Sequence, residues 1–88
     1  MHPDSKTPGP FRASGAPRII RLHRTTRVTF AWSPAHDPEL EGYQFTLDGQ
    51  TSTLAPAVRT FVATIRPGVH HWSVAAYDLS GNRTEAAN

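Results

Sequence analysis

The sequence predicts an all-β fold, a sandwich of two antiparallel sheets with about seven short strands, behind a flexible N-terminal leader. Three observations predict it. Apolar and polar residues alternate with a period of two in five separate runs, no segment shows a helical period, and turn-forming residues fill the gaps between the runs. The five runs are residues 20–22, 28–32, 43–47, 61–65 and 70–76.

Each run has one face suited to a core, because successive side chains of a strand point to opposite sides. A single open sheet would leave the large aromatic side chains wet, at roughly 1.5–3 kcal/mol each, so we expect two sheets packed face to face. The side chains predicted to face the core are Ile20, Leu22, Val28, Phe30, Trp32, Tyr43, Phe45, Leu47, Phe61, Ala63, Ile65, His70, Trp72, Val74 and Ala76.

Turn chemistry separates the runs. Asp48 and Gly49 favour a tight turn because both tolerate positive φ. Residues 78–82 predict a hairpin turn in which Asp78 accepts turn amides and Gly81 takes positive φ. A last short strand is expected near residues 83–87, and the irregular stretch around Leu54 could hold an edge strand.

Residues 1–16 form the predicted leader or linker, and residues 17–88 the single domain. The first sixteen residues are rich in Pro and Gly, and apart from Met1 their only large apolar residue is Phe11. Such a segment buries too little surface to offset its ordering entropy, so we expect it to be disordered.

Composition narrows the possible functions. The chain has no cysteine, which excludes disulfides and a thiolate zinc site. No apolar run of about 18 residues predicts membrane insertion, and the N-terminal residues lack the apolar stretch of a signal peptide. The formal net charge is only +2, but arginines dominate the first third of the chain.

Four segments resemble one family. Residues 28–34 are similar to the second strand of a fibronectin type III domain, with its core Trp at Trp32, and residues 42–49 to the third strand and its turn. Residues 65–68 resemble the family's Leu-x-Pro-Gly corner, and residues 72–82 the ending shared with bacterial immunoglobulin-like repeats. The corner tyrosine of the family is replaced by His70, whose imidazole could supply a similar bond. The integrin-binding tripeptide Arg-Gly-Asp is absent.

The resemblance implies a non-catalytic binding, spacer or accessory module of a bacterial secreted or cell-surface protein. We expect an extracellular location, covalent linkage to other domains in a longer native chain, and a protein or polysaccharide partner that the sequence does not identify. In this topology the loop of residues 33–41 and the turn of residues 78–82 lie at one end. The candidate contact residues there are His36, Asp37, Glu39, Glu41, Leu79, Ser80 and Asn82.

A second hypothesis is a basic module that binds nucleic acid or another anionic polymer through Arg18, Arg21, Arg24 and Arg27. We favour the simpler interpretation, in which these arginines protect an exposed edge strand from association. A third hypothesis, a small hydrolase, finds little support, since the sequence has no Gly-x-Ser-x-Gly motif and the chain is too short for a cleft beside its core.

Neither a metal site nor a cofactor site is expected. His70 and His71 would point to opposite sides of one strand, and the acidic residues of the 33–41 loop lack the ligand pattern of an EF-hand. Trp32 and Trp72 are in phase with core positions, so we expect them to pack inside rather than to stack on sugars. Tyr77 alone is expected on an outer face.

Overall fold

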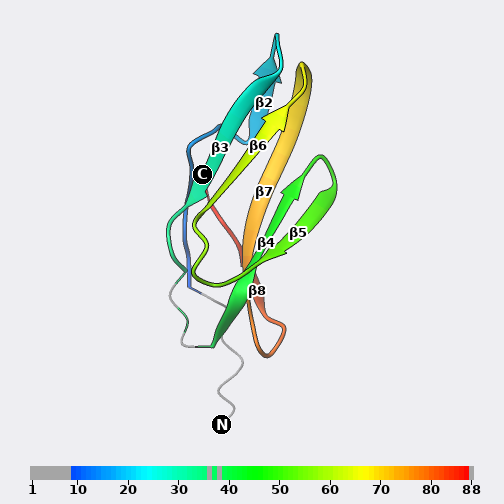
Figure 1. Ribbon diagram of the computed structural model, residues 1–88. Coiled ribbons are helices and arrows are strands. Elements are labelled where there is room, and N and C mark those ends of the chain that lie inside the picture. Colours follow the sequence, from blue (N-terminus) through cyan, green and yellow to red (C-terminus); the bar gives the residue numbers. More distant parts are fainter. Residues whose placement is uncertain (1–8, 36, 38, 88) are drawn as a thin grey trace.

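The computed structural model describes residues 9–35, 37 and 39–87, and this part of the chain contains strands and no helix. The strands form two antiparallel sheets packed face to face, so the predicted β-sandwich is confirmed (Figure 1). No helix long and apolar enough to cross a bilayer occurs among these residues. The strands are β1 (Ala13–Ser14), β2 (Ile19–Leu22), β3 (Thr26–Trp32), β4 (Leu40–Leu47), β5 (Gln50–Leu54), β6 (Thr60–Ile65), β7 (Gly68–Asp78) and β8 (Arg83–Glu85).

The smaller sheet has the order β1-β3-β6. Strand β3 pairs with β6 along its length, from Thr26 opposite Ile65 to Ala31 opposite Thr60. Strand β1 covers only the end of β3, where Ala13 lies opposite Trp32. The alternation of residues 28–32 therefore turns one face of β3 toward the other sheet.

The larger sheet is organised around β7. Strand β4 pairs with one edge of β7, and β5 pairs with the far edge of β4. The other edge of β7 is shared by two strands at different heights: β2 lies opposite residues 68–71 and β8 opposite residues 75–77. The long β7 thus pairs with three strands, and β5 joins the same layer through β4.

Aromatic side chains from both sheets fill the space between them. Phe30 on β3 contacts Trp72 on β7, with 4.8 Å between ring centroids, and Phe45 on β4 stacks on Phe61 of β6 at 4.5 Å. Trp72 is only 3% exposed, and its indole N–H donates to the carbonyl of Pro17. The predicted inward hydrophobic positions are all buried or packed against the core.

The predicted boundary between leader and domain is wrong for residues 11–16. Phe11 is buried at 4% exposure and its ring lies 5.6 Å from that of Tyr43. Around it, Ala13 donates a backbone hydrogen bond to Ala87, and Ala87 donates one to Phe11. One large apolar side chain and a few ladder bonds thus hold a Pro- and Gly-rich segment in the fold. Residues 1–8 of the predicted leader lie outside the described residues.

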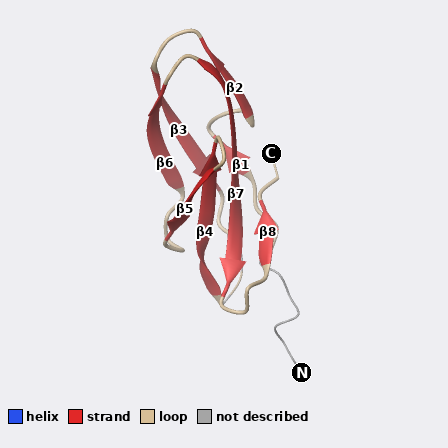
Figure 2. Ribbon diagram, turned by 90° about the vertical axis from the view of Figure 1, so that its right-hand side faces the viewer, coloured by secondary structure: helices blue, strands red, loops and turns tan. Residues whose placement is uncertain are grey.

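Two ends of the sandwich are used below. The tip consists of the β2–β3 turn (residues 23–25) and the β6–β7 turn (residues 66–67), together with the strand residues next to them. The base consists of the described residues between β3 and β4 (33–35, 37 and 39) and the β7–β8 turn (residues 79–82). Figure 2 shows the two ends at opposite extremes of the molecule.

Candidate functional site

The base brings together the two loops that the sequence predicts to lie side by side. The backbone N–H of Leu79 donates to the carbonyl of Glu39 at 3.2 Å, and Leu40 lies opposite Asp78 in the β4–β7 ladder. The candidate residues Asp37, Glu39, Glu41, Leu79, Ser80 and Asn82 therefore belong to one surface, called the base surface here. His36 lies outside the described residues.

The side chain of Asp78 stabilises the β7–β8 turn through hydrogen bonds. Its side chain is buried, and Oδ1 accepts the backbone N–H groups of Ser80 and Asn82 at 3.0 and 2.9 Å. The side-chain amide of Asn82 donates to Oδ2 of the same carboxylate at 3.3 Å. Gly81 has a φ of 90°, as the turn chemistry predicts. Asn82 thus serves the turn, and Leu79 and Ser80 are its exposed members.

The acidic half of the base surface is shaped by a bulge. The β4–β7 register shifts between Leu40 and Gly42, so Glu41 is the extra residue and is exposed. Gly42 is required there, because a Cβ atom at this position would lie 2.3 Å from the carbonyl oxygen of Leu54. Nearby, Asp37 Oδ1 accepts the N–H of Glu39 at 2.8 Å and orders the loop before β4.

Chemically, the base surface combines carboxylates with one exposed apolar side chain. Leu79 is 69% exposed, the highest fraction among the large hydrophobic residues given as exposed in the described chain. Among the described residues no three His, Asp or Glu side chains come close enough together to hold a metal ion. This arrangement offers a partner several hydrogen-bond acceptors beside one apolar contact.

His70 and Asp48 form a second polar cluster, near the tip. Nδ1 of His70 lies 2.6 Å from Asp48 Oδ2, and Nε2 lies 2.8 Å from the carbonyl oxygen of Arg66. Asp48 and the Arg66 carbonyl both offer acceptor oxygens, so this arrangement favours the form of His70 in which both ring nitrogens carry protons. The bond to Arg66 connects the imidazole to the backbone four residues upstream.

Asp48 connects the β4–β5 turn to β7. Its Oδ1 accepts the backbone N–H of His71 at 3.0 Å, and its own φ of 51° with that of Gly49 at 86° gives the predicted tight turn. The bond to Asp48, with a smaller contribution from the Arg66 carbonyl, raises the pKa of His70. The same bond, with that from His71, lowers the pKa of Asp48. The sequence marks each residue separately, but not this contact across 22 positions.

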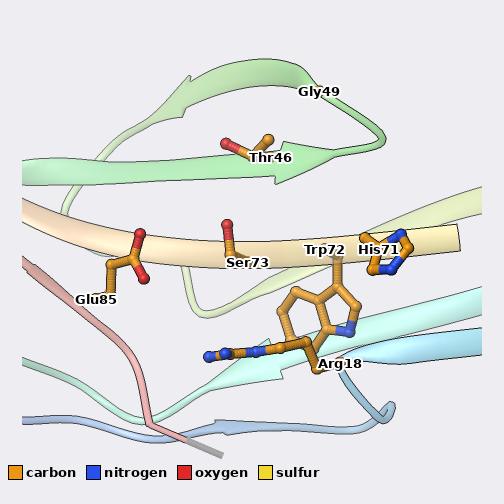
Figure 3. A pocket seen from close by; sticks show the side chains of 7 residues that line it. All are labelled: Arg18, Thr46, Gly49, His71, Trp72, Ser73 and Glu85. Atoms are coloured by element: carbon orange, nitrogen blue, oxygen red, sulfur yellow. The ribbon is translucent and has the colours of Figure 1, made fainter.

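A shallow groove lies on the outer face of the larger sheet (Figure 3). It measures about 210 Å³, below the roughly 300–1,000 Å³ of typical ligand sites. Thr46, Ser73 and His71 border it from β4 and β7, and Arg18 and Glu85 from the neighbouring segments. His71 therefore faces away from His70's partners, as predicted. The groove has polar rims and no enclosed volume, so it is a weak candidate for a small-molecule site.

The four arginines of the nucleic-acid hypothesis do not share one face. Arg18 borders the groove, and Arg21 lies opposite Val69 on the outer face of the larger sheet. Arg27 lies opposite Thr64 on the smaller sheet, and Arg24 lies in the turn between β2 and β3. A flat cationic strand face is therefore not formed.

The expected packing of the tryptophans is confirmed, because Trp32 and Trp72 are each 3% exposed.

Comparison with known proteins finds no counterpart: no family model, no curated protein and no solved structure matches this chain. The fold and the side-chain geometry described above are thus the basis for a functional assignment.

Proposed function

We propose that this sandwich is a non-catalytic interaction module of the fibronectin type III or bacterial immunoglobulin-like kind, carried by a longer secreted or cell-surface protein. The base surface is its contact region. The observation that carries this proposal is the hydrogen bond between Leu79 and Glu39, which joins two loops distant in sequence into one exposed surface on a rigid scaffold.

The first and last described segments of the chain run side by side in the same direction. Arg12 and Ala87 pair in parallel, so the chain enters along β1 from the base side and leaves past β8 toward the tip.

The resemblance to fibronectin type III domains supports the same assignment. His70 makes the bond to the backbone four residues upstream that the family's corner tyrosine makes. The extracellular location and the bacterial host in this proposal derive from the resemblance alone. A protein or a polysaccharide remains the proposed class of partner.

Sedimentation with insoluble cellulose, chitin and xylan tests the proposal, with the supernatant assayed for released sugar. We expect retention without product, and loss of retention in Leu79→Asp, which places a charge in the apolar centre of the base surface. Val62→Asp is the matched control, because Val62 is also exposed, at 45%, but lies on β6 away from the base.

Release of soluble sugar by the wild-type chain would contradict the non-catalytic assignment. Equal retention of both variants would remove the base surface as the contact region. Absence of retention on every polysaccharide would exclude these partners and leave a protein as the partner class.

A further inference from the structure

Four arginines surround the tip, at the end of the molecule opposite the base. Arg24 lies in the β2–β3 turn and Arg66 in the β6–β7 turn. These turns are neighbours, because the ends of β2 and β7 pair with each other, as do the ends of β3 and β6 (Figure 1). Arg21 and Arg27 stand a few residues away, on the two outer faces. The cluster of Arg21, Arg24, Arg27 and Arg66 is called the arginine tip here.

The charge of the arginine tip is not compensated within the described part of the chain. The only ion pair there is that between His70 and Asp48, and none of the four arginines takes part in it. Asp48 is the acidic residue nearest to the tip in the pairing register, and its carboxylate is already occupied by His70 and the N–H of His71. Four exposed guanidinium groups therefore create a positive field at one end of a chain whose net charge is only +2.

Side chains hold both tip turns in place. The hydroxyl of Thr26 donates to the carbonyl oxygen of Arg24 at 2.8 Å, and the imidazole of His70 donates to that of Arg66 at the same distance. These bonds order the backbone on which the two terminal arginines stand. A pre-ordered backbone lowers the entropy lost when a partner binds.

We infer that the arginine tip is a docking surface for the phosphate backbone of duplex nucleic acid, independent of the base surface. The planar guanidinium fork matches the geometry of phosphate oxygens and binds them in pairs. Neither tip turn carries Phe, Tyr or Trp, and the small ring of His23 is the only aromatic ring in the two turns, so a single strand gains less from stacking there than a duplex gains from its phosphate contacts. Contacts limited to phosphates position a protein on DNA without reading its sequence.

This surface differs from the predicted arginine set in two ways. Arg18 is not part of the arginine tip, because it borders the groove. Arg66 is part of the tip, although it lies more than 40 positions after Arg24 in the sequence. Linear spacing within the first third of the chain does not predict that second turn. The ladder between β2 and β7 places it there.

Fluorescence anisotropy with a labelled duplex of about 20 base pairs tests the inference, at salt concentrations between about 20 and 200 mM. Four phosphate contacts predict a slope of log affinity against log salt near −3.6 for the full chain. A single strand of the same length and a heparin fragment serve as competing polyanions. We expect the duplex to bind more tightly than the single strand.

The variant pair separates the arginine tip from general charge. Arg24→Gln with Arg66→Gln removes two tip cations, and Arg59→Gln with Arg83→Gln removes two exposed cations away from the tip. The tip variant should lose at least about tenfold in affinity at low salt and flatten the slope by about 1.8, whereas the control should change less than about twofold.

Three results would overturn the inference. The first is that the wild-type protein does not bind the duplex at low salt. The second is that the two double variants show equal losses of affinity for the duplex. Binding to heparin without binding to the duplex would assign the tip to a sulfated polysaccharide instead of nucleic acid. Retained circular-dichroism spectra of both double variants exclude unfolding as the cause of any loss.

Discussion

At the residue scale, His70 joins the β4–β5 turn, 22 positions away in the sequence, to the turn that precedes β7. Its two ring nitrogens form hydrogen bonds with Asp48 in the β4–β5 turn and with the carbonyl of Arg66 before β7. The sequence predicts that an imidazole here could bond back to the backbone, because the position follows a Pro-Gly corner. It does not predict Asp48 as the second acceptor, since strand pairing across 22 residues decides which turn arrives beside β7.

The protonation of His70 makes stability depend on pH. The pKa of His70 in the folded chain is raised above the ordinary value of 6.5. The stability that its protonated ring contributes is therefore fully present below about pH 6.5, and it is lost as pH rises through the pKa of the folded chain. The pKa of Asp48 is lowered from 3.8, so its contribution is present above that value and is lost as pH falls through the folded one. The contact between His70 and Asp48, called the clamp here, therefore contributes most to stability between these two pH limits.

Replacing His70 with Gln tests this dependence. We expect the difference in melting temperature between wild type and His70→Gln to be largest near about pH 5 and to shrink near about pH 9, because the imidazolium then loses a proton. His71→Gln is the matched control, since it removes an exposed histidine next to the clamp. A difference that stays constant over this range would show that His70 acts by packing alone.

At the element scale, periodicity predicts most strands, and long-range pairing decides the remainder. Residues 28–32, 43–47 and 61–65 alternate over enough positions to mark their strands and core faces. Strand β1 has two residues and no period, so only the presence of Phe11 could have marked its segment. Strand β5 is exposed for most of its length, and so lacks the alternation that burial imposes.

Substitution of Phe11 measures how firmly the N-terminal segment is held. Phe11→Ala should destabilise the domain by about 3–5 kcal/mol, because it empties a buried aromatic position next to Tyr43. Urea unfolding followed by tryptophan fluorescence gives the value. Leu79→Ala, at an exposed turn position, should stay within about 0.5 kcal/mol of wild type. Equal unfolding midpoints for Phe11→Ala and wild type would show that residues 11–16 are a leader and not part of the folded domain.

At the scale of the whole molecule, charge and exposure differ between the two ends. The base presents Glu39, Glu41 and Leu79, and the tip presents four arginines that form no ion pair with another described residue. The proximity of the two base loops was predictable because the topology of the resembled family places them at the same end, and the bond between Leu79 and Glu39 agrees with it. The arginine tip was only half predictable, because Arg66 reaches it through sheet pairing and not through proximity in the chain.

Both proposals depend on the same two-layer core, in which aromatic rings of opposite sheets touch. Nuclear Overhauser spectroscopy between Phe30 of β3 and Trp72 of β7 tests that core most directly, since their ring centroids lie 4.8 Å apart. The sandwich predicts strong cross-peaks between these rings, together with slow exchange of the Trp72 indole proton bonded to Pro17. Missing cross-peaks and a rapidly exchanging indole proton would contradict it.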